Sequence, residues 1–115
     1  MATLDKTRNP IPKRLNEAMA RAGVSQKTLG IRCGIDPSVA SSRINHYCTG
    51  RHVPNFTLLL KAAAVLKVPV SYFYTPDNDL ARMLASYQAL SVRTRKEAVI
   101  EIELLASRVA NKPSV

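Results

Sequence analysis

Residues 24–54 read VSQKTLGIRCGIDPSVASSRINHYCTGRHVP, and this stretch predicts two short helices joined by a tight glycine turn. Ser25 is placed to cap the first helix, and Val24 can pack against Leu29 as a hydrophobic staple across its start. Gly34 can take the left-handed conformation that ends this helix.

The second helix of the stretch begins with an Asp-Pro pair. Asp36 is the expected cap, and Pro37 stands at the first helical position, where no backbone N–H is needed. Gly50 closes this helix. Two short helices that meet at a glycine form a helix-turn-helix, whose second helix can enter the major groove of DNA. The sequence therefore predicts a DNA-binding regulator.

Basic residues are concentrated in the front of the chain. Of the 115 residues, 17 are Lys or Arg and eight are Asp or Glu, which gives a formal net charge of +9. Residues 1–74 hold eleven Lys or Arg against three acids, whereas residues 75–115 hold six against five. This distribution predicts that residues 1–74 bind a polyanion and that residues 75–115 have another role.

The predicted fold class is all-α, because apolar residues recur at helical spacing and no strand-like alternation is present. We expect a flexible basic arm at 1–8, a five-helix DNA-binding domain at 9–76 and a C-terminal dimerisation segment of two helices at 77–115. Asn9 is the expected cap of the first helix, Pro54-Asn55 opens the fourth, and residues 70–74 form a short fifth. The predicted apolar stripes are Leu15, Ala18, Met19 and Ala22 in the first helix and Phe56, Leu59, Leu60, Ala63 and Leu66 in the fourth.

Two further helices are predicted in the C-terminal segment, the second of them opened by a capping box at Thr94-Arg95-Lys96-Glu97. The apolar stripe of the second is wider than one side of a surface helix requires. It could pack on the domain ahead of it, but we favour a homodimer, because that domain has a core pattern of its own and symmetric pairs are the commonest oligomers. The predicted dimer-interface residues are Leu80, Leu84, Tyr87, Ile102, Leu105 and Val109.

The second helix of the helix-turn-helix carries groups that suit base edges. With Ala40, Ile44 and Tyr47 turned into the core, one side of this helix is polar. Asn can pair with adenine, Arg with guanine, and Ser with several base edges. The predicted base-reading residues are Ser38, Ser41, Ser42, Arg43 and Asn45. The predicted phosphate contacts come from the helix start at residue 25 and the loop after Gly50, and they are Ser25, Gln26, Lys27, Arg51 and His52.

From Ile11 to about Phe73 the chain resembles the phage-repressor helix-turn-helix family (Cro-like, or xenobiotic-response-element, XRE). The matching features are Ser25-Gln26, Leu29, Gly34-Ile35-Asp36, Gly50-Arg51, Pro54, Leu59-Leu60, Ala63, Leu66 and the run from Val68 to Phe73. The resemblance implies a five-helix domain that binds operator DNA as a dimer, usually to regulate transcription. By position it implies a phosphate contact for Gln26 and base-facing places for Pro37, Ser38 and Ser42.

The chain departs from the family pattern at two places. The stretch from Gly34 to Gly50 is longer by about one helical turn, so we expect the second helix of the motif to extend through Tyr47. Cys48 also stands where the family commonly has Glu, two residues before the closing glycine.

Other classes of function find little support in the sequence. No nucleophile–base pair, Gly-rich phosphate loop or metal-ligand spacing is visible, so we expect no catalytic residues, no metal and no cofactor. The two cysteines, Cys33 and Cys48, lack CxxC spacing, and a redox role for Cys48 stays a secondary interpretation. No segment reaches the ~20 apolar residues of a membrane span, and we expect a cytoplasmic protein.

The favoured hypothesis is a homodimeric transcription regulator, acting as a repressor on a palindromic operator. One alternative is an antitoxin-type protein that neutralises a partner protein through its apolar C-terminal segment and regulates its own synthesis by binding DNA. A second alternative is a nucleoid protein with little sequence preference.

Overall fold

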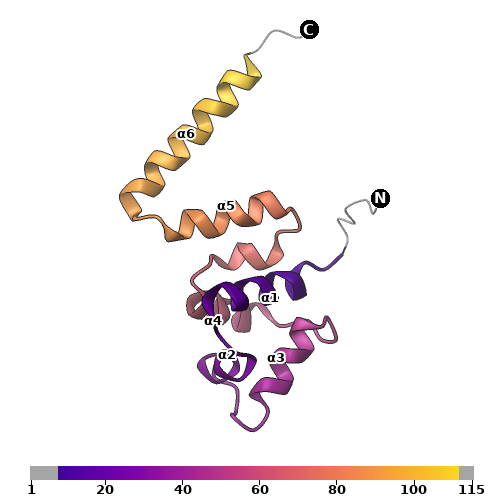
Figure 1. The fold of residues 1–115 in the computed structure, drawn as a ribbon. Helices are drawn as coiled ribbons and strands as arrows, with labels where there is room; N and C mark the ends of the chain where they lie inside the picture. Colours follow the sequence, from indigo (N-terminus) through magenta and orange to yellow (C-terminus); the bar gives the residue numbers. More distant parts are fainter. Residues whose placement is uncertain (1–7, 112–115) are drawn as a thin grey trace.

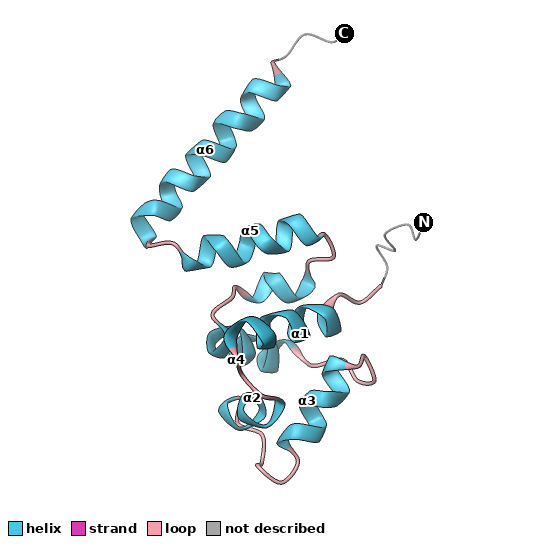
Figure 2. Cartoon of the chain, viewed as in Figure 1, coloured by secondary structure: helices cyan, strands magenta, loops and turns pink. Residues whose placement is uncertain are grey.

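The computed structural model describes residues 8–111, and every regular element in that range is a helix (Figures 1 and 2). The prediction of an all-α chain is therefore confirmed. The element order is α1 (Ile11–Ala22), α2 (Gln26–Arg32), α3 (Ala40–Cys48), α4 (Phe56–Leu66), the 3₁₀ helix η1 (Val70–Tyr74), α5 (Asn78–Ala89) and α6 (Val92–Ala110). Of the predicted basic arm, residues 1–7 lie outside the described residues.

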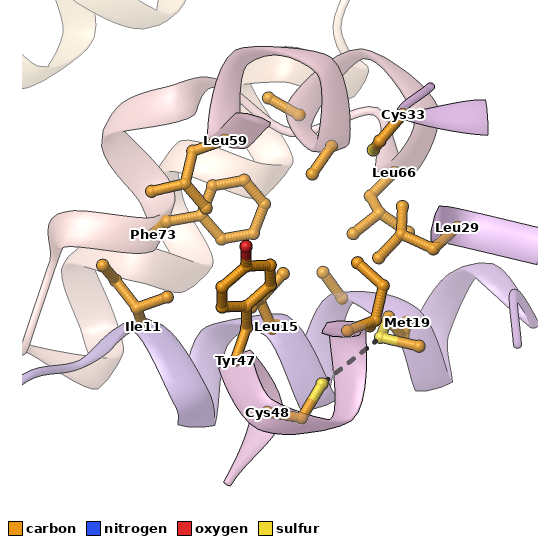
Figure 3. Close-up of a cluster of buried hydrophobic side chains, with 14 of the residues drawn as sticks. Ile11, Leu15, Met19, Leu29, Cys33, Tyr47, Cys48, Leu59, Leu66 and Phe73 are labelled. Carbon is orange, nitrogen blue, oxygen red and sulfur yellow. Dashed lines mark hydrogen bonds between the residues drawn. The ribbon is translucent and has the colours of Figure 1, made fainter. Parts of the chain in front are cut away.

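Helices α1–α4 and η1 enclose one apolar core (Figure 3). Its most deeply buried large side chains include Leu15, Leu29, Leu59 and Phe73, each no more than 1% exposed. On α3 the core residues are Ala40, Ile44, Tyr47 and Cys48. The first three were predicted, and their burial fixes which side of α3 faces outward.

The start and end of α2 follow the sequence signals. The Ser25 hydroxyl accepts a hydrogen bond from the backbone N–H of Thr28 at 3.1 Å. Gly34 has φ +85°, the left-handed conformation expected after the helix. Local capping chemistry therefore sets both boundaries of α2.

The predicted start of α3 is wrong, because this helix begins at Ala40 rather than after Asp36. One carboxylate oxygen of Asp36 accepts from the backbone N–H of Ser38 at 2.9 Å and from its hydroxyl at 2.6 Å. These two bonds close an Asx turn that keeps residues 37–39 outside the helix. Ser38 therefore lies in the turn, two residues before the first residue of the helix on which it was expected. The C-terminal end of α3 agrees with the prediction, since the helix extends through Tyr47 and ends at Cys48.

The predicted apolar stripes of two helices are only partly correct. In α4, Leu59, Ala63 and Leu66 are buried, but Phe56 and Leu60 are exposed and Ala62 is buried in their place. In α1, Ala22 is exposed while the other three predicted residues are buried. The start of α4 is as predicted, since the Asn55 side chain accepts from the backbone N–H of Leu58 at 2.8 Å.

The predicted capping box of the last helix is also wrong. Ser91 caps α6, and its hydroxyl accepts from the backbone N–H of Thr94 at 3.2 Å. The observed cap therefore lies three residues before Thr94, the expected cap, and α6 begins at Val92. Arg95 donates to the carbonyls of Tyr87 and Gln88 at 3.1 and 2.7 Å, which ties the beginning of α6 to the end of α5.

The C-terminal helices lie on the side of α1 away from α2 and α3, and α6 extends away from the rest of the fold (Figure 1). A buried arginine joins the two regions. Arg14 of α1 donates to the carbonyls of Thr75 and Pro76 at 2.8 and 2.9 Å and to the Asn78 side chain at 3.0 Å. Its guanidinium also pairs with Glu17 at 2.7 Å. Arg14 thus fixes the beginning of α5 to the core domain.

Candidate nucleic-acid interface

One side of α3 presents a row of exposed polar side chains. The opposite side of the helix is buried in the core, and the exposed side chains are Ser41, Ser42, Arg43 and Asn45. Hydroxyl, guanidinium and amide groups are those that pair with base edges in the major groove. Four of the five predicted base-reading residues thus share one accessible helix.

The fifth predicted base-reading residue, Ser38, lies in the turn before α3 and is also exposed. Its hydroxyl proton is directed to the Asp36 carboxylate, 2.6 Å away. Hydrogen bonds from the Ser38 hydroxyl and backbone hold the pKa of Asp36 below its usual range. Toward an incoming ligand, Ser38 can therefore offer its oxygen as an acceptor rather than its proton.

A side-chain hydrogen bond joins a predicted phosphate contact to a predicted base contact. The amide nitrogen of Gln26 donates to Oδ1 of Asn45 at 3.1 Å. An amide oxygen has two lone pairs, so Oδ1 can accept once more while Nδ2 donates. That is the pattern that recognises adenine, and Gln26 restricts the rotation of the Asn45 side chain that would present it.

The loop after α3 places two more cationic or ionisable side chains beside the helix. The Thr49 hydroxyl donates to the carbonyls of Asn45 and His46 at 3.0 and 3.3 Å. The backbone N–H of His52 donates to the His46 carbonyl at 3.2 Å. The two imidazole rings lie 4.9 Å apart between centroids. Arg51, which directly precedes His52, is exposed and makes no hydrogen bond or ion pair with residues 8–111.

The electrostatics of this region favour an anion. Residues 25–53 contain four Lys or Arg and a single acid, Asp36. The four basic residues, all exposed, are Lys27, Arg32, Arg43 and Arg51. Phosphate groups of a duplex are held mainly by such side chains, so the helix-turn-helix stretch supplies exposed cations as well as the polar side of α3.

The predicted dimer face is exposed in the single chain. No residue of α6 is buried. Of the six predicted interface residues, Leu84 is half-buried and the others are 38–64% exposed, namely Leu80, Tyr87, Ile102, Leu105 and Val109. The alternative in which these helices pack on the domain ahead holds for part of α5, where Ala81 is buried, and for none of α6.

Among residues 8–111 no group of three His, Cys, Asp or Glu side chains could hold a metal ion. In the same range no helix combines the length and apolarity needed to cross a membrane. Cys33 and Cys48 are both reduced and buried, and burial raises the pKa of each thiol. Cys48 also contacts Met19, with the two sulfur atoms 3.8 Å apart (Figure 3).

Two residues that fix how the helices pack were not singled out from the sequence. Gly30 of α2 lies against Ala40 of α3, and a Cβ added at Gly30 would come 2.7 Å from the Cβ of Ala40. Arg14 was counted with the basic front, but it is only 1% exposed and does not reach a ligand. A signal for Arg14 existed, because it stands three residues after Ile11 and four before Ala18, inside the apolar stripe of α1.

Comparisons with known proteins place the chain beside a solved regulator. No protein-family model matches the chain, and no curated protein matches it. Among solved structures, the chain is similar to one described as the crystal structure of the transcriptional regulator BswR. The two chains are 39% identical, the match covers 85% of this chain and 97% of the BswR chain, and the TM-score is 0.79.

Proposed function

We propose that this chain, which belongs to the same family as the transcriptional regulator BswR, is a sequence-specific DNA-binding repressor of the XRE type that acts in the cytoplasm as a homodimer on a palindromic operator. The observation that carries the proposal is the exposed polar side of α3, within a stretch, residues 25–53, that holds four exposed basic residues and a single acid. A polyanion with readable edges is the ligand that fits both features.

In the proposed complex α3 lies in the major groove. Ser41, Ser42, Arg43 and Asn45 face the bases, and the Ser38 oxygen accepts from a donor at the edge of the site. Lys27 and Arg51 neutralise phosphates on either side, with Ser25, Gln26 and His52 as further phosphate contacts. Two copies related by a two-fold axis would read half-sites about one DNA turn (~34 Å) apart.

The homodimer rests on the exposed apolar residues of α5 and α6. Apart from the half-buried Leu84, the predicted interface residues are each more than a third exposed, and all the large apolar side chains of α6 are exposed along its length. An apolar surface of this kind is typical of a protein interface. The same exposure favours one alternative, an antitoxin-type protein whose α6 binds a partner protein. A stable homodimer in sedimentation would support the first proposal, and a monomer that becomes a heteromeric complex would support the second.

The first test is DNA binding across a salt series, measured by fluorescence anisotropy. The probes are the DNA upstream of the protein's own gene and a random duplex of equal length. We expect tight binding to a palindromic site in the first probe, weaker binding to the second, and a steep loss of affinity with salt. Equal affinity for both duplexes would contradict base reading by α3 and favour a nucleoid protein.

A further inference from the structure

Helix α6 lacks the packing that ordinarily stabilises a helix. It runs for 19 residues with none buried, and its large apolar side chains are 42–68% exposed. Most helical stability in proteins comes from packing an apolar face against another element. The exposed apolar side chains of α6 therefore indicate that another surface packs against this helix.

That surface does not lie on the same chain. Only Leu90 and Ser91 connect α5 to α6. Arg95 fixes the first turn of α6 to the last carbonyls of α5 through its two hydrogen bonds. From that point α6 points away from α1–α4 (Figure 1). A second copy of the chain can supply the surface on which α6 packs, because α6 cannot reach such a surface on its own chain.

A groove with a suitable floor lies between the ends of α1 and α4 and one side of α5. It encloses about 490 Å³, and its apolar floor includes Leu66, Val68, Ala85 and Ala89. Alanine side chains are short, so a helix can approach the α5 side of this groove closely. The exposed predicted dimer residues of α5, such as Leu80 and Tyr87, lie on another side of that helix.

The rim of the groove is cationic. Arg21, Lys67 and Arg82 line it. Arg82 is 3.5 Å from Asp79, but both side chains are more than 80% exposed, so this pair is weak. Lys67 has φ +58°, a conformation in which helices usually end with glycine. A lysine held there places a charge at the rim at some cost in backbone strain.

The middle of α6 has the complementary charge. Residues 97–107 contain three glutamates and no Lys or Arg. Helical spacing puts Glu101 beside Leu105 and Glu103 beside Val99, four residues away in each case. Glutamates therefore flank the apolar stripe of α6 on both edges, where cations at the rim of a groove would meet them.

We propose that residues 97–107 of α6 dock into the α1–α4–α5 groove of a second copy, with the glutamates against Arg21, Lys67 and Arg82. The proposal rests on the proposed homodimer and adds its mode of assembly. By two-fold symmetry each copy gives its α6 and receives that of its partner, so both grooves are filled.

Charge reversal tests the docking with two variants of the full chain. The groove variant carries Lys67→Glu and Arg82→Glu, and the helix variant carries Glu101→Lys and Glu103→Lys. A control matched to the groove variant, Arg32→Glu with Lys61→Glu, makes the same charge change at exposed positions outside the groove. Circular dichroism checks that each protein is folded, and analytical ultracentrifugation with native mass spectrometry measures association.

We expect each variant alone to raise the dimer dissociation constant by about tenfold or more, while the control leaves it unchanged. An equimolar mixture of the two variants should recover wild-type affinity as a heterodimer, because both of its interfaces again join opposite charges. Variants that dimerise like wild type, or a mixture that fails to recover, would overturn the docking and leave the homodimer intact. A wild-type chain that stays monomeric would overturn the homodimer itself, and the docking with it.

Discussion

Gly30 of α2 lies so close to Ala40 of α3 that no side chain fits between the two helices at this position. A Cβ at Gly30 would lie 2.7 Å from the Cβ, 2.9 Å from the carbonyl oxygen and 3.0 Å from the Cα of Ala40. Such distances are well inside van der Waals contact, so the angle between the two helices depends on the missing side chain.

Gly30→Ala should therefore destabilise the protein. Helix propensity alone would stabilise it by up to about 1 kcal/mol, but overpacking at a rigid contact costs typically 1–3 kcal/mol. We expect a net loss in urea unfolding and weaker DNA binding. Adding Ala40→Gly should restore only part of the stability, because two of the three clashes are with the backbone. A gain in stability from Gly30→Ala alone would show that the helices are not so close.

Asn45→Ala should weaken operator binding by about 1–3 kcal/mol and relax the preference at one base position. Gln26→Ala should produce part of the same loss, because Gln26 holds the Asn45 amide through the 3.1 Å hydrogen bond. The double variant should then cost less than the sum of the two, as a double-mutant cycle measures. Unchanged affinity and unchanged base preference in Asn45→Ala would mean that α3 is oriented differently on DNA.

Arg51→Ala should weaken binding to all sequences about equally. Its exposed guanidinium is proposed to neutralise one phosphate, so the slope of log affinity against log salt should fall by about one. Titrations of operator and random DNA at several salt concentrations measure this. Arg93→Ala, at an exposed arginine on α6, is the control and should leave the slope as it is.

Ile102→Glu should shift the protein from dimer to monomer, because it places a charge within the apolar stripe of α6. Ile100→Glu is a close control. Ile100 is also exposed, but helical spacing puts it roughly on the opposite side of α6. Sedimentation velocity should separate the two variants. If Ile102→Glu sediments like wild type, Ile102 lies outside the interface.

Much of the fold could be predicted from the sequence because its signals are local. The Ser25 cap, the left-handed Gly34 and the Asn55 cap each act within a few residues, and all three are present in the structure. The error at the start of α3 is also local. Asp36 can cap a helix or close an Asx turn, and nothing in its immediate sequence decides between the two.

The features that the sequence did not reveal join residues far apart in the chain. The contact of Gly30 with Ala40 depends on how two helices cross. The hydrogen bond from Gln26 to Asn45 spans 19 positions. Arg14 meets Thr75 across 61 positions. Residue types and spacing indicated which side chains would face outward on α3, but tertiary packing determines which of them touch.

Arg14 has a consequence for the length of the operator. Because Arg14 fixes the beginning of α5 to α1, we expect the domain that carries α3 to keep a set orientation relative to α5. The proposed homodimer should then hold its two copies of α3 at a set distance. Inserting one base pair between half-sites moves the second half-site by about 3.4 Å and turns it by roughly 35° around the duplex axis. A homodimer with a fixed distance between its two copies of α3 cannot follow either displacement. It should therefore contact such an operator through one half-site only.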